Sequence, residues 1–138
     1  MLLACVYLTT GCGSDFDDIS VSDPWIAEAP PTATVMAAYM RIDNHSDRTR
    51  RLLSISGPRE LQIALHHTSD THGMLRMNQV DTLEIPANGQ VLLAQGGYHL
   101  MIHGSAANYR SSSKMELNLM FEDGMIVPVI ATVKSLLP

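Results

Sequence analysis

The sequence predicts an all-β domain, a sandwich or a barrel built from short strands. Apolar and polar residues alternate over short runs, which is the period of a strand with one buried face. Turn-forming residues recur roughly every eight to twelve residues, as in sandwiches and barrels. No segment keeps the spacing of an amphipathic helix over three turns. The 138 residues suit one domain that can bury a core without disulfides or a structural metal.

In the first half of the chain, alternating runs are bounded by turn signals. Residues 19–22 alternate and continue into Trp25, and the two prolines at 30 and 31 mark a loop because proline cannot sit inside a central strand. Leu61, Ile63 and Leu65 should share one strand face, and Gln62, Ala64 and His66 the other. The strands expected here are residues 19–25, 35–42, 51–55 and 61–66.

The second half shows the same pattern with clearer turns. Pro86-Ala87-Asn88-Gly89 and Gly96-Gly97 separate short apolar runs, and Glu122-Asp123-Gly124 is typical of a hairpin turn. The longer polar connection 104–114 precedes the last hairpin. The strands expected here are residues 74–80, 82–85, 91–94, 98–103, 115–121 and 125–134.

The chain begins with an apolar stretch, residues 1–12, that is too short to cross a bilayer as a helix, which takes about 20 residues. We interpret residues 1–18 as an export signal or lipoprotein-type leader with a polar tether, and residues 19–138 as the folded domain. Thr9-Thr10-Gly11-Cys12 is similar to a lipoprotein cleavage box, so Cys12 is the candidate lipid-anchor site. No Lys or Arg precedes the apolar run, and the alternatives are a start further upstream or a disordered apolar tail.

Charge and motifs exclude several classes of function. The net charge of −5 argues against a nucleic-acid partner, which would need a basic face. The sequence has no plausible nucleophile–base pair, no phosphate loop and no two carboxylates at a spacing typical of acid–base catalysis, so we do not expect an enzyme. A blue-copper centre needs a cysteine beside its histidines, and residues 19–138 contain none.

The histidines and methionines are spaced as His66-x10-Met77-x21-His99-x-Met101. Imidazole and thioether are neutral donors, a combination suited to a soft, singly charged metal, above all Cu(I). In the strand 98–103, alternation places Tyr98, Leu100 and Ile102 toward the core, and we expect His99, Met101 and His103 to face outward. A turn at Gly73 would bring Met77 back toward His66, although spacing alone does not close the set.

Each of these residues also has a plain structural interpretation. A methionine in a strand usually fills the core, and an isolated surface histidine is usually only solvated. The hypothesis of a metal site rests on the combination of these features: an outward-facing His-x-Met beside a His/Met-rich loop in a chain expected to be exported.

The four-residue spacing matches, without gap or shift, the motif of the periplasmic PCu(A)C copper chaperones, which the chain resembles over roughly residues 20–133. Further similar segments are residues 37–40, 73–77, 96–101 and 121–124. The resemblance implies a cupredoxin-like Greek-key β-sandwich with an exposed Cu(I) site. Its ligands by this resemblance are His66, Met77, His99 and Met101.

The resemblance also implies a function and a location. Such a protein would deliver copper to the CuA centre of cytochrome c oxidase, in subunit II, directly or with a Sco-type copper protein. We expect a monomer in the periplasm or at the extracytoplasmic face of the membrane. Two rival hypotheses remain: copper storage or resistance, and a metal-free β-sandwich adhesion or assembly module.

The chain departs from the family pattern at its extra histidines. His103 stands where the family commonly has methionine, and His67 and His72 are additional donors in the loop. Imidazole tolerates Cu(II) better than thioether does, so the three can form a secondary Cu(II) site. The alternative is that they are solvated surface residues.

Overall fold

The structure is a computed structural model that describes residues 18–137. All regular secondary structure in this range is β-strand, and the range holds no helix long and apolar enough to cross a membrane. The all-β prediction is confirmed. The ten strands are β1 (Ile19–Ala27), β2 (Val35–Asn44), β3 (Arg50–Ser56), β4 (Gln62–Thr71), β5 (Met74–Gln79), β6 (Leu83–Ile85), β7 (Gln90–Leu93), β8 (Tyr98–His103), β9 (Lys114–Phe121) and β10 (Ile126–Lys134).

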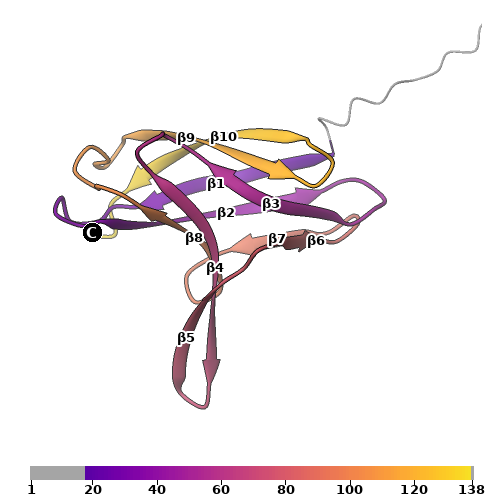
Figure 1. Ribbon diagram of the computed structural model, residues 1–138, viewed down its shortest axis with the longest axis horizontal. Helices are drawn as coiled ribbons and strands as arrows, with labels where there is room; N and C mark the ends of the chain where they lie inside the picture. The colour runs from indigo at the N-terminus through magenta and orange to yellow at the C-terminus, as the bar shows by residue number, and fades with distance from the viewer. Residues whose placement is uncertain (1–17, 138) are drawn as a thin grey trace, which may run out of the picture.

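The strands form one hydrogen-bonded path in the order β5-β4-β8-β2-β1-β10-β9-β3-β6, and β7 pairs with β2 off this path. The β1–β10 pair is parallel, and the other pairs are antiparallel. Figure 1 shows a flattened body from which the β4–β5 hairpin projects. β5 is therefore both an edge strand and the most isolated one, and all six of its residues are exposed.

The core is built from one face of each long strand. Along β9 every second residue, from Met115 to Phe121, is buried, and its neighbours are exposed. In β2 the residues of the hydrophobic core are Met36, Ala38, Met40 and Ile42, and in β8 Leu100 and Ile102 are fully buried. Because side chains alternate across a strand, the residues between them on β2 and β8 point to the outer face.

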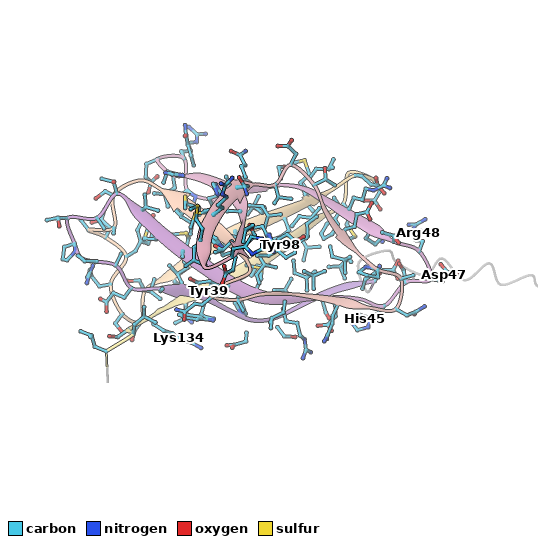
Figure 2. All side chains as sticks on the ribbon, turned by 90° about the horizontal axis from the view of Figure 1, so that it is seen from below. Tyr39, His45, Asp47, Arg48, Tyr98 and Lys134 are labelled. Atoms are coloured by element: carbon cyan, nitrogen blue, oxygen red, sulfur yellow. The ribbon has the colours of Figure 1, made fainter. Side chains whose placement is uncertain are left out.

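Buried polar residues close one end of the body. The Asn44 side-chain amide donates to the carbonyl oxygens of Arg48, Ile85 and Pro86, and its oxygen accepts from Ser46. The Arg50 guanidinium, close by in sequence and only 2% exposed, pairs with Asp18 and Asp123. Figure 2 shows His45, Asp47 and Arg48 at this end, whereas Tyr98 lies near the middle of the molecule.

The strand boundaries agree with the sequence-based expectation within a few residues, except at β4. A turn was expected after His66, but β4 continues to Thr71 and the turn is confined to His72 and Gly73. Residues 68–71 are all polar and lack the alternation that marks a half-buried strand, because this part of β4 projects from the body. The predicted leader, residues 1–18, lies almost wholly outside the described residues and stays a prediction.

Candidate metal centre

The β4–β5 hairpin brings Met77 back alongside β4. His72 and Gly73 at its tip have φ values of 55° and 79°. Positive φ at both central residues belongs to the tight type I′ turn, whose twist matches that of the strands it joins. The Gly73 amide also donates to the Asp70 carboxylate at 2.8 Å. The hairpin that the sequence suggested at Gly73 is thus present, with Met77 paired to Thr68.

The strand register places the four motif residues on one face. His66 lies directly opposite His99, and Met101 lies opposite Ala64, two residues before His66. Met77 lies opposite Thr68, two residues after His66. Directly opposed residues of antiparallel strands share a face, as do residues two apart on one strand. His99 is therefore the direct neighbour of His66, and the two methionines are its diagonal neighbours on either side.

Gly97 orients the imidazole of His99. Its carbonyl oxygen lies 3.1 Å from His99 Nδ1 and also accepts the Thr68 amide of β4 at 3.1 Å. Since a carbonyl only accepts, Nδ1 carries the proton, and the lone pair of the neutral ring is at Nε2. Such a contact fixes the tautomer of metal-binding histidines. The same carbonyl thus anchors β4 and presents Nε2 of His99 as a donor for a metal.

His99 faces outward on β8 as expected, but its side chain is buried. His99 lies on the predicted outer face of β8, opposite to Leu100 and Ile102, but it is only 5% exposed. β4 and β2 flank β8, and β4 places the His66 ring alongside, 6.0 Å away between centroids. The exposed side chain of the set is Met77, which is 51% exposed on the projecting hairpin.

His66 carries an unsatisfied buried atom. Its Nδ1 is shielded from solvent and has no hydrogen-bond partner. Buried polar atoms are normally paired, and an exception calls for an explanation such as a ligand. Burial, together with the nearby imidazoles of His99 and His103, lowers the pKa of His66 below its ordinary value. His66 therefore stays neutral, the form that binds metal, to lower pH than a free histidine does.

The surroundings of the four residues favour a soft ion. Within residues 18–137 no three side chains of His, Cys, Asp or Glu gather closely enough to hold a metal. Two imidazoles would therefore need the two thioethers to complete a coordination sphere. No carboxylate joins the set, which disfavours hard ions such as Ca²⁺ and Mg²⁺. The donors present fit Cu(I) best.

The three additional histidines do not form one site. His67 points to the opposite face from His66 and packs on Tyr98, with ring centroids 4.3 Å apart. His72 lies at the hairpin tip, six residues beyond His66 along the chain. Only His103, opposite Gln62, shares the face of the four motif residues. The structure thus does not bring His67, His72 and His103 together as a Cu(II) site.

Three features of the site were not predicted from the sequence. The Gly97 carbonyl has no side-chain signal, and the orphaned Nδ1 of His66 depends on packing. Ala64 and Ala37 lie opposite Met101 on the two strands that flank it. Small residues on both sides leave lateral space around the thioether. The period of two could have indicated Ala64, because it lies two residues before His66 on the same face.

Three comparisons place the chain among known proteins. The sequence model described as "Putative lipoprotein LpqE-like" matches residues 19–133. A putative lipoprotein of Leifsonia xyli subsp. xyli is 29% identical over 124 residues, which are 89% of this chain and 74% of the relative. Among solved structures, the Cu(I) form of DR1885 from Deinococcus radiodurans is 31% identical, with a TM-score of 0.64 over 84% of this chain and 76% of that one.

The copper-bound PCuAC domain of PmoF2 has a higher TM-score, 0.70, at 22% identity, over 86% of this chain and 93% of that domain. At this identity the likeness shows the fold, and it confirms the cupredoxin-like β-sandwich. The fold, together with a His/Met face at the root of the β4–β5 hairpin, defines the class as that of PCuAC domains. Within that class, the match over residues 19–133 shows that the chain belongs to the LpqE-like family.

Proposed function

We propose that this protein is an extracytoplasmic metallochaperone that binds Cu(I) through His66, Met77, His99 and Met101. The observation that carries the proposal is the register, which places all four side chains on one sheet face around His66. The unpaired Nδ1 of His66 and the oriented ring of His99 support it. Two related solved structures, the PmoF2 domain and DR1885, are described as copper-bound and Cu(I)-bound.

The geometry suits transfer of the ion. His99 is buried and anchored, whereas Met77 is half exposed on a hairpin that projects from the body. A partner can approach Met77 and replace its thioether while the imidazoles still hold the copper. Neutral ligands leave Cu(I) with its single positive charge, so no charge pair has to be broken. Transfer would proceed by stepwise ligand exchange, without release of the free ion.

The acceptor in this proposal is the CuA centre of cytochrome c oxidase subunit II, reached directly or through a Sco-type copper protein. The domain acts as a monomer outside the cytoplasm and performs no catalysis. Cys12 is proposed as the lipid anchor, in keeping with the lipoprotein description of the family and of the Leifsonia relative. Mass spectrometry of the membrane fraction would test lipidation, with Cys12→Ser as the control.

The delivery role is tested by mixing the Cu(I)-loaded protein with the apo CuA domain of subunit II, or with an apo Sco-type protein. A strong Cu(I) chelator is added that captures any free ion. We expect copper to reach an acceptor faster than the chelator alone removes it. Equal rates with and without acceptor would contradict associative delivery. A protein that retained copper in the presence of both acceptors would favour storage or resistance instead.

A further inference from the structure

One face of β8 carries three donors of increasing exposure. His99 is 5% exposed, Met101 is half-buried and His103 is exposed. The three are spaced by two residues, so all lie on the outer face with His66 and Met77. The candidate metal centre uses only the first two. His103 thus extends the donor row from the buried imidazoles to solvent.

The residues beside this row leave it open. Met101 lies opposite Ala64 on β4 and Ala37 on β2, and His103 lies opposite Gln62 and Val35. The alanine side chains are too short to cover the thioether from either side. None of the four carries a charge that would pair with His103 or repel a cation. An ion or a small chelator can therefore reach Met101 along the strand from the His103 side.

Strand geometry decides which donors can share an ion with His103. Residues two apart on a strand have Cα atoms about 7 Å apart, a span that a methionine and a histidine can bridge through one metal. His99 is four residues from His103, about 13 Å, and His66 lies opposite His99. His103 therefore lies at the far end of the donor row from both imidazoles, and Met101 is its adjacent donor. It can share an ion with Met101.

We propose that His103 and Met101 form an outer Cu(I) position, through which copper passes between solvent and the inner set of His66, Met77, His99 and Met101. Met101 belongs to both positions and hands the ion from one to the other. The inference rests on the proposed Cu(I) function and adds a route for exchange with solvent or a small chelator, separate from the exchange with a partner at Met77. His103 is a transit ligand in this scheme and is absent from the final coordination sphere.

A transit ligand has a distinct kinetic signature. Its loss raises the barrier for loading and for unloading equally, so both rates fall by the same factor while the dissociation constant stays unchanged. A resident ligand behaves differently, because its loss speeds unloading and weakens the affinity. The comparison of rates with affinity therefore separates the two roles.

The test uses the full chain and stopped-flow exchange of Cu(I) with a colorimetric chelator, in both directions and without oxygen. For His103→Ala we expect loading and unloading to slow by about tenfold, equivalent to a donor contact of about 1.4 kcal/mol, with an unchanged dissociation constant. His103→Met should keep the wild-type rates, because a thioether also binds Cu(I). His72→Asn, which removes an exposed imidazole at the hairpin tip and suits the positive φ there, is the matched control.

Three results would overturn the inference: unchanged rates in His103→Ala, faster unloading with weaker binding, or a His103→Met variant as slow as His103→Ala. Equal unfolding midpoints in wild type and variants show that the fold is intact. Failure of the proposed function itself is recognised separately. In that case the wild-type protein takes up no Cu(I), or binds it regardless of Met77 and Met101.

Discussion

His66 and His99 lie directly opposite each other on β4 and β8, with their ring centroids 6.0 Å apart. The two residues are 33 positions apart in sequence, and the β4–β8 pairing alone brings them together. The side chain of one has an unpaired buried nitrogen, and that of the other is oriented by a backbone carbonyl. This pair is the centre of the proposed copper site.

The neighbouring histidines His66 and His67 offer a matched pair, because they point to opposite faces of β4. We expect His66→Ala to weaken Cu(I) binding by at least about tenfold, the effect of losing about 1.4 kcal/mol of binding free energy. His67→Ala should leave the affinity unchanged. Competition against a chelator of known affinity measures both. Similar losses in the two variants would mean that the faces are assigned wrongly.

The lowered pKa of His66 predicts a pH dependence of stability. The unfolded chain takes up a proton at this residue near pH 6.5, whereas the folded protein takes it up only at lower pH. The stabilising contribution is therefore fully present above about pH 6.5 and is lost as the pH falls below it. Urea unfolding of the apo protein between pH 7.5 and 5.5 should show this loss, and His66→Gln should reduce it. An NMR titration giving His66 a pKa above 6.5 would contradict the prediction.

The turn at the tip of the β4–β5 hairpin should control the copper affinity. Gly73 has φ 79° with open space around it, so Gly73→Ala adds only backbone strain, about 1 kcal/mol. We expect this strain to loosen the hairpin and weaken Cu(I) binding several-fold, with little change in the global unfolding midpoint. His72→Asn removes an imidazole but suits the turn, since asparagine tolerates positive φ. It should bind Cu(I) like wild type, and a loss there would implicate His72 as a ligand.

Asn44 should matter for stability and not for copper. Its replacement by alanine removes the buried amide that donates to the carbonyls of Arg48, Ile85 and Pro86 and the oxygen that accepts from Ser46, which costs about 1–3 kcal/mol of unfolding free energy. Asn44 lies seven residues along β2 from Ala37, about 23 Å. Asn44→Ala should therefore lower the free energy of unfolding, measured with denaturant, and leave the Cu(I) affinity, measured by titration, unchanged. Asn118→Ala, at an exposed position of β9, serves as the control and should alter neither.

Much of the fold could be predicted from alternation and turn residues. The strand 98–103 was predicted with its observed bounds, and its face assignment holds because Leu100 and Ile102 are core residues. The outer half of β4 was missed because its polar residues project from the body, where burial imposes no pattern.

The candidate site could be predicted only in part. The spacing of His66, Met77, His99 and Met101 indicated a common soft-metal site, and the resemblance supplied the ligand set. Which histidines share a face depends on register between β4 and β8, and pairing of distant strands leaves no local signal. The burial of His99 likewise depends on β4 lying alongside. His67 was expected in a loop, because the polar residues after His66 gave no sign that β4 continues, so its place on the opposite face could not be predicted.

In the proposed Cu(I) site, Met77 and Met101 complete the ligand set with the two histidines. The most direct measurement is anaerobic Cu(I) titration of the full chain against a colorimetric chelator, comparing wild type with Met77→Ala plus Met101→Ala. Met74→Ala plus Met120→Ala, two exposed methionines off the site face, is the matched control. The four-ligand site predicts tight one-to-one binding in wild type and control, and its loss in the first variant. Binding that survives loss of Met77 and Met101, or that is absent from wild type, would contradict it.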